Sequence, residues 1–395
     1  MVINKKYFLF LFFGTLFLFP LKALAYRWPF DDGNGPAGPH RITAAFGEFR
    51  SVSSGFPEGR LHAGQDMNPS NTSSGTDAIG LTVYAIEGGI AHPFKTSTTD
   101  VNERLQVGRF VYVHVVSLVD EGDSVNANDP IATIKNISAS ETPHLHLAEF
   151  QDSSSTIQLD PIRPEGLDNY IDNFSPSVFS PNFYHDSQGD QFVAAANGSV
   201  IVWGKVDIRA RAVDSSPNSS GQIGLYQMGF GVQNPDGTFA LPVTYRIVMS
   251  QLQMPNQGAL EYDNSNEAGD RGVIYDPTDS NNSTFFYWVT SRLNSQDDNN
   301  QDGVARNGFW NTKQKINQDE SIDAIINFES KFPDDKYIVW SVGKDIEGNG
   351  GDLENRVGAD SQSVTIDNFM PYVQSVSILQ GLNVFYGAAW PVTAQ

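Results

Sequence analysis

The chain has 395 residues, with 25 Lys or Arg against 46 Asp or Glu, and its formal net charge at pH 7 is −21. Nucleic acids and anionic lipid surfaces bind basic patches, which a chain this acidic is not expected to have. Neither a nucleic acid nor an anionic lipid surface is therefore an expected partner. It contains no cysteine, which excludes disulfides and thiolate metal sites and leaves His, Asp and Glu for any metal.

The N-terminal segment has the pattern of a secretory signal peptide. Lys5 and Lys6 precede an apolar run from Tyr7 to Pro20, and Ala23-Leu24-Ala25 forms a small-residue cleavage site. The apolar run is short for a bilayer span. We therefore expect a mature chain that begins near Tyr26, has no stable membrane span after cleavage and is exported to the periplasm or the exterior of a bacterial cell.

Residues 26–160 predict a compact all-β domain. The segments Ile42–Phe49, Leu81–Ile86, Phe110–Val116 and Pro130–Ile134 are apolar or β-branched runs bounded by turn residues. No convincing helical pattern interrupts them, and many short strands between turns are typical of all-β architectures.

Four of the seven histidines of the chain lie in this domain in strand-like segments. His144 and His146 alternate with leucines, so on a strand they share one face. His62 and Asp66 are four residues apart, which we expect to be extended, and His114 stands in the middle of an apolar run. Neutral imidazole is the commonest metal ligand in proteins, although each of these residues alone also fits a solvated or core position.

Together, His62-x-x-x-Asp66, His114 and His144-x-His146 resemble the motifs of lysostaphin-type (LytM-like) zinc endopeptidases. This family cleaves peptide bonds in bacterial cell-wall murein.

Two framing segments agree with the resemblance, which covers residues 42–150. Thr82–Ala85 followed by Gly88-Gly89 is similar to the strand after the first ligand pair, and Asp120–Val125 is similar to the family's Glu-Gly-x-x-Val turn.

The resemblance implies that His62, Asp66 and His146 bind zinc and that His114 and His144 form the catalytic pair. Three protein ligands leave one tetrahedral position for water, whose pKa falls to about 7 on zinc. Two further imidazoles then transfer protons and stabilise the oxyanion. The expected function is a secreted zinc metalloendopeptidase, a hydrolase that acts on peptidoglycan peptides in crosslinks or bridges.

Two segments depart from the family pattern. Lys135–Thr142 lacks the usual glycine-rich stretch with Gly-Pro before the paired histidines, and the loop Asn68–Ile79 is longer than usual. These differences leave open an alternative, a non-catalytic cell-wall or amidase-activating binding protein on the same fold. A structural surface protein is a third interpretation. His40 and Asp31, in the lead-in, are candidates to block the zinc in a latent form.

The second half predicts a β-sandwich. Lys205–Ala212 alternates strictly between polar and apolar residues, and Asn234–Gly237 has the composition of a hairpin turn. Lys344-Asp345-x-x-Gly348-Asn349, followed by Val364–Pro371, resembles the closing strands of bacterial immunoglobulin-like domains.

The predicted fold class is therefore all-β, with a compact antiparallel β-sheet peptidase domain and a β-sandwich second domain. The expected division is a signal peptide over 1–25, a lysostaphin-like zinc peptidase domain over 26–160, a linker over 161–190, an immunoglobulin-like β-sandwich over 191–375, and a tail or the start of a further module over 376–395.

Overall fold

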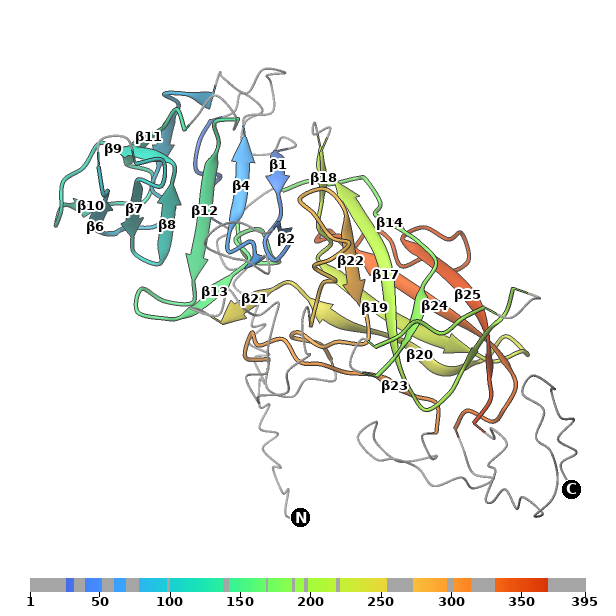
Figure 1. The fold of residues 1–395 in the computed structure, drawn as a ribbon. Coiled ribbons are helices and arrows are strands. Elements are labelled where there is room, and N and C mark those ends of the chain that lie inside the picture. The colour runs from blue at the N-terminus through green and yellow to red at the C-terminus, as the bar shows by residue number, and fades with distance from the viewer. Residues whose placement is uncertain are drawn as a thin grey trace, which may run out of the picture.

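The computed structural model shows an all-β protein with several antiparallel sheets, which confirms the predicted fold class (Figure 1). The structure describes residues 26–31, 40–51, 60–68, 78–97, 100–137, 142–167, 170–186, 189–194, 198–217, 221–253, 273–296, 301–313 and 331–368. Within these ranges every regular element is a strand, and none contains a helix long and apolar enough to cross a membrane. The predicted signal peptide over 1–25 lies outside the described residues.

Three sheets contain most of the first half. The largest has the order β1 (Arg41–Ala44), β4 (Gln65–Asn68), β12 (Leu145–Phe150), β8 (Phe110–Val113), β7 (Arg104–Val107), β6 (Gly89–Phe94) and β10 (Ser124–Val125). β13 (Ile157–Leu159) pairs with β12, and β21 (Gln251–Gln253) pairs with β13. The second sheet has the order β5 (Thr82–Tyr84), β11 (Pro130–Ile134) and β9 (Val115–Ser117), and the third pairs β2 (Phe49–Arg50) with β3 (Arg60–Leu61).

Two sheets make up the second half, to the right in Figure 1. In one, the long β17 (Lys205–Ser215) pairs with β14 (Ser177–Val178), β15 (Asn182–His185), β18 (Gln222–Ile223), β22 (Phe285–Trp288) and β23 (Trp310–Asn311). The other has the order β16 (Val200–Val202), β25 (Ala359–Ile366), β24 (Lys336–Lys344), β19 (Gln227–Gln233) and β20 (Phe239–Val248).

The alternation read from the sequence of β17 is present in the structure. Val206, Ile208, Ala210 and Ala212 are fully buried, and they share one hydrophobic core with Phe230 and other residues of the facing sheet. The turn predicted over Asn234–Gly237 connects β19 to β20. The period-two pattern therefore identified the core face correctly.

Two strands predicted in the first half are shorter than expected. The run 42–49 is divided because the chain turns at Gly47, whose φ of 76° favours glycine. The run 110–116 is divided at His114, which lies between β8 and β9 with a φ of 65°.

The two halves are joined by more than a connecting segment. β15, which lies inside the predicted linker over 161–190, pairs with β17 over four residues, and β13 of the first half pairs with β21. Phe46, Phe49 and Leu61 belong to the hydrophobic core of the second half. The predicted domain division therefore stays a prediction, with chain contacts that cross it.

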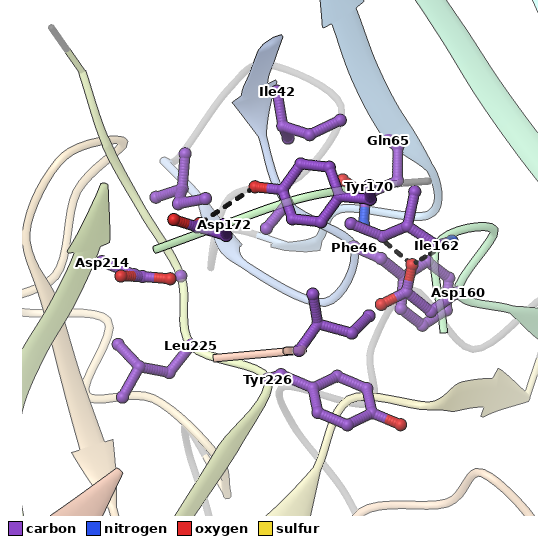
Figure 2. Close-up of a pocket in the computed structure, with 14 residues that line it drawn as sticks. Ile42, Phe46, Gln65, Asp160, Ile162, Tyr170, Asp172, Asp214, Leu225 and Tyr226 are labelled. Carbon is purple, nitrogen blue, oxygen red and sulfur yellow. Dashed lines mark hydrogen bonds between the residues drawn. The ribbon is translucent and has the colours of Figure 1, made fainter. Parts of the chain in front are cut away.

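A small cavity lies where the halves meet, and Figure 2 shows its walls. Gln65 and Asp160 are fully buried on one wall, and Gln65 Nε2 donates a hydrogen bond to Asp160 Oδ1 at 2.8 Å. Burial raises the pKa of Asp160 from an ordinary 3.8 to about 7, although Gln65 opposes the rise. Close to neutral pH this carboxyl is thus partly protonated.

The stability of the protein should depend on pH through Asp160. Its folded pKa lies above its unfolded pKa, so its stabilisation is complete at acid pH and is lost as the pH rises through about 7. Asp160→Asn keeps a neutral side chain of the same shape at every pH. We expect this variant to become more stable relative to wild type as the pH rises from acid to pH 8. The difference between their free energies of unfolding should change by up to about 4 kcal/mol. Urea unfolding across this pH range measures the gain. A difference that does not change with pH would contradict it, and Asp190→Asn, at an exposed loop carboxylate, is the control.

Candidate metal and catalytic site

The register of the largest sheet brings the predicted site residues together. In β12, His146 is the cross-strand partner of Asp66 on β4 and also of Val113 on β8. His114 directly follows Val113, and His144 lies two residues before His146 on the same face. His62 precedes β4 by three residues. Three neighbouring strands therefore place five residues from distant parts of the sequence in one group.

One carboxylate oxygen lies at the centre of this group. Asp66 Oδ1 is 2.8 Å from His146 Nδ1, 3.1 Å from His62 Nε2 and 3.4 Å from His144 Nε2. His62 Nε2 and His146 Nδ1 are themselves 3.0 Å apart. The ring of His114 lies beside this group, with its centroid 4.8 Å from that of His144 and 6.2 Å from that of His146.

Backbone carbonyls fix the tautomers of three of the histidines. His62 Nδ1 donates to the Ala45 carbonyl at 2.9 Å. In the same way, Nδ1 of His114 donates to Val101 at 2.7 Å and Nδ1 of His144 donates to Thr142 at 2.8 Å. A carbonyl only accepts, so each Nδ1 carries the proton and each Nε2 keeps its lone pair. Such second-ring hydrogen bonds orient metal-ligating and catalytic imidazoles.

His114 adopts a backbone conformation that is costly for its residue type. Its φ of 65° lies in the left-handed region, which residues with a Cβ rarely adopt. His114 N and Val115 N both donate to the Glu103 carbonyl, and Lys135 N donates to the His114 carbonyl. These hydrogen bonds hold the strained residue between two strands and aim its ring at the group, as strained residues at functional sites often are.

Arg50 supports the site, and the sequence analysis missed it. Arg50 Nη2 lies 2.6 Å from Asp66 Oδ2, so it engages one carboxylate oxygen and leaves Oδ1 to the imidazoles. Arg50 also lies 3.6 Å from Glu48, whose Oε2 accepts hydrogen bonds from Ala45 N and Gly224 N. A single arginine within a short strand gives no sequence signal of this role. Through Glu48 and Gly224, the contacts that hold Arg50 extend to a loop of the second half.

Gly64 leaves the space that His146 occupies. A Cβ at this position would lie 2.5 Å from the Leu147 carbonyl and 2.6 Å from His146 Nε2. Both distances are far below contact, and the first involves backbone that cannot rotate away. Only glycine fits between the two ligand-bearing strands here.

Burial and charge set the protonation of the group. Burial, helped by Arg50, lowers the pKa of His62 to about 3, and burial with His144 lowers the pKa of His114 to about 4. Burial opposes ionisation of Asp66, but the surrounding imidazoles outweigh it and hold the pKa of that carboxyl well below its ordinary range. For His144, burial is likewise outweighed by Asp66, which raises the pKa of this imidazole.

The donor set fits a zinc ion. His62, Asp66 and His146 each offer one ligand atom, and these atoms lie within 4.8 Å of one another. A tetrahedron with bonds of roughly 2.0–2.1 Å has edges of about 3.3 Å, so the three atoms lie slightly closer than a zinc ion would hold them. Two nitrogens and one carboxylate oxygen are ligands that zinc accepts. The described residues can thus hold a metal ion.

The other positions named from the sequence have different surroundings. His40 is buried and its ring stacks on Trp28 with centroids 4.0 Å apart. Lys135 pairs with Glu103 at 2.7 Å, on the side where His114 is held. Most of the two departing segments, over 69–77 and 138–141, lies outside the described residues, so their effect on the groove stays a prediction.

Comparisons with solved structures find likenesses to lysostaphin. No family model and no curated protein matches the chain. The catalytic domain of the antimicrobial peptidase lysostaphin from Staphylococcus simulans is 22% identical, over 29% of this chain and 84% of that one, with a TM-score of 0.23. A solution structure of lysostaphin is 13% identical over 69% and 94%, with a TM-score of 0.25. Another structure of the antimicrobial peptidase lysostaphin from the same organism is 17% identical over 52% of this chain and 89% of that one, with a TM-score of 0.22. At TM-scores this low the likenesses carry no weight alone, and the chemistry rests on the side chains of this chain.

Proposed function

We propose that this protein is a secreted zinc metalloendopeptidase that hydrolyses peptide bonds in bacterial cell-wall peptidoglycan. The observation that supports it most is the convergence of His62, Asp66 and His146 beside two further imidazoles, those of His114 and His144. Three ligands with an open fourth position are typical of catalytic rather than structural zinc sites. The murein substrate comes from the resemblance of the motifs to lysostaphin-type endopeptidases.

In this proposal, His62 Nε2, Asp66 Oδ1 and His146 Nδ1 hold the zinc ion. When bound, zinc supplies Lewis-acid polarisation of the scissile carbonyl and lowers the pKa of a water molecule to about 7. Arg50 keeps the Asp66 carboxylate turned toward the metal through its contact with Oδ2. The carbonyl of Ala45 keeps His62 in the tautomer that has a free Nε2.

His114 and His144 are the proposed proton-transfer residues. Each ring is anchored through Nδ1. His144 Nε2 lies 3.4 Å from Asp66 Oδ1, and the ring of His114 lies beside those of His144 and His146. The two Nε2 atoms receive the proton of the attacking water, donate hydrogen bonds to the developing oxyanion and return a proton to the leaving amine. Neither ring is a ligand in the proposed site, so both remain available for these steps.

Digestion of purified murein sacculi by the full mature chain tests the proposal. Mass spectrometry of the soluble fragments should identify products of peptide-bond hydrolysis. These products should disappear after treatment with a chelator and reappear when zinc is added back, because the three ligands hold the ion reversibly.

A matched pair of variants separates the site from other histidines. His62→Ala should release no products, whereas His92→Ala should behave as wild type, since His92 is exposed and contacts Glu121 away from the group. Folded, zinc-loaded protein that binds sacculi but releases nothing would favour the non-catalytic binding protein. Fragments cut in the glycan would exclude the endopeptidase assignment.

A further inference from the structure

A second group of metal-type donors lies away from the imidazoles. Asp172, Asp214 and Asp345 each offer one carboxylate oxygen, and these atoms lie within 4.8 Å of one another. The three side chains are 4%, 4% and 3% exposed. Figure 2 shows Asp172 and Asp214 together on the wall of the cavity between the halves. The motif and the chemistry of the proposed peptidase site use none of them.

The hydrogen bonds of this carboxylate trio leave one oxygen without a partner. Asp172 accepts from Phe174 N at 2.9 Å and from Tyr170 Oη at 3.1 Å. Asp345 accepts from Asn349 N at 2.8 Å and from Asn349 Nδ2 at 2.7 Å. Asp214 Oδ1 is buried and receives no hydrogen bond from the residues that the structure describes. A buried carboxylate oxygen without a donor is costly, and such an atom needs a proton, a water molecule or a cation.

Among the described residues, positive side chains do not balance the trio. In the described part of the chain, no Lys, Arg or His forms an ion pair with Asp172, Asp214 or Asp345. Lys344, the positively charged residue next to Asp345 in the sequence, places its Nζ over the ring of Tyr245 instead. Buried negative charges that lie this close to one another are normally paired with a cation or a metal.

We propose that Asp172, Asp214 and Asp345 bind one divalent cation of the calcium type. All three donors are carboxylate oxygens, which hard cations prefer, whereas zinc favours nitrogen and sulfur. Calcium accepts six to eight oxygens in irregular arrangements, while magnesium requires a nearly regular octahedron. The cavity leaves about 20 Å³ for the centre of a water-sized sphere, and one water needs roughly 10–15 Å³ on that measure. Asp172 and Asp214 line this cavity, so a water ligand could reach the trio from their side.

Burial and mutual repulsion agree with this assignment. Burial raises the pKa of Asp214 to about 8, and its two neighbours add to the rise. Burial likewise raises the pKa of Asp345 to about 6, against the hydrogen bonds from Asn349. A bound cation would compete with these protons and keep the trio ionised.

The position of the site gives it a structural role. Asp172 lies on the segment that leads from the first half to the second, Asp214 lies in β17, and Asp345 directly follows β24. One cation would thus tie the connecting segment to both sheets of the second half. Asn349 already joins two of these segments, because its Nδ2 also donates to the Asp172 carbonyl at 2.7 Å.

The test measures the melting temperature of the full mature chain after metals are stripped. Calcium chloride at millimolar concentration should raise Tm by about 5 °C or more, since a ligand that binds only the folded state stabilises it. Magnesium chloride and zinc chloride should not produce a rise in Tm that is lost when Asp214 is replaced. Isothermal titration calorimetry should count one calcium ion lost when Asp214 is replaced.

Asp214→Asn separates cation binding from general packing. This variant keeps the shape of the side chain and cannot become charged beside its two neighbours, so its calcium-free Tm should be equal to or above that of wild type. Calcium should then raise its Tm little or not at all. Asp172→Asn is the second variant if Asp214→Asn fails to fold. Asp160→Asn, a buried carboxylate of the same cavity outside the trio, should keep the calcium shift.

Three results would overturn the proposal. One is a calcium shift in Asp214→Asn and Asp172→Asn as large as in wild type. Another is the absence of both a Tm shift and calorimetric binding in wild type. The third is an equal response to magnesium through Asp214, which would refute the calcium class. His62→Ala should leave the calcium response intact, so the outcome does not depend on the peptidase assignment.

Discussion

Replacing His114 by alanine should lower kcat/KM for peptide-bond hydrolysis by about 10²–10⁴-fold, the usual contribution of a positioned proton-transfer group. The ring is anchored through Nδ1 on the Val101 carbonyl, and its centroid lies 4.8 Å from that of His144. Zinc content, measured by elemental analysis, should stay near wild type because His114 is not among the three ligands. Kinetics on a murein peptide measure the loss.

A glycine at the same position distinguishes catalysis from folding. The φ of 65° at His114 is costly for alanine but not for glycine, so His114→Gly should be more stable than His114→Ala by about 1 kcal/mol. Both variants should nevertheless be equally inactive. If the glycine variant recovered activity together with stability, His114 would have a structural role and the proposed proton transfer would be wrong.

The periodicity of the sequence was sufficient for the fold class and for the shared face of His144 and His146. Alternation in β17 and around His144 and His146 reflects side-chain direction on a strand, which is a local property. The spacing of His62 and Asp66 is also local. Their union with His114 depends on the strand order β4, β12, β8, which no single segment encodes, and only the family resemblance supplied it.

Other parts of the site could not be predicted from the sequence. Some depend on contacts between distant segments, and others are backbone groups rather than side chains. The carbonyls of Ala45, Val101 and Thr142 fix three tautomers, and a backbone carbonyl has no sequence signal. Arg50 acts through an ion pair that forms only when β2 and β4 pack together. The left-handed conformation of His114 is imposed by tertiary hydrogen bonds against the preference of the residue.

The junction of the halves shows the same limit. Asp172, Asp214 and Asp345 lie far apart in the sequence, and each alone has the appearance of a solvated loop residue. Their burial results from the packing of the connecting segment against two sheets. Strands in the predicted linker also pair with β17, because turn-rich composition indicates exposed connections without excluding short edge strands.

Gly64→Ala should disable the site without removing any ligand. The new Cβ would lie 2.5 Å from the Leu147 carbonyl and 2.6 Å from His146 Nε2, so β12 and the His146 ring must move away from β4. A displacement of about 1 Å at reacting groups costs on the order of 10²-fold in rate. We expect a loss of that size in kcat/KM, a weaker affinity for zinc, and a loss of about 1–3 kcal/mol in the free energy of unfolding from overpacking.

Gly189→Ala is the matched control, because a Cβ there meets His185 Cβ at an ordinary 3.4 Å. It should change the free energy of unfolding by no more than about 0.5 kcal/mol and leave activity unchanged. Zinc titration of Gly64→Ala, followed by a competing chelator, separates a displaced ligand from a merely slower enzyme. Wild-type zinc affinity and wild-type kcat/KM in this variant would mean that His146 Nδ1 need not occupy its observed position, and His146 would then have to be withdrawn from the proposed ligand set.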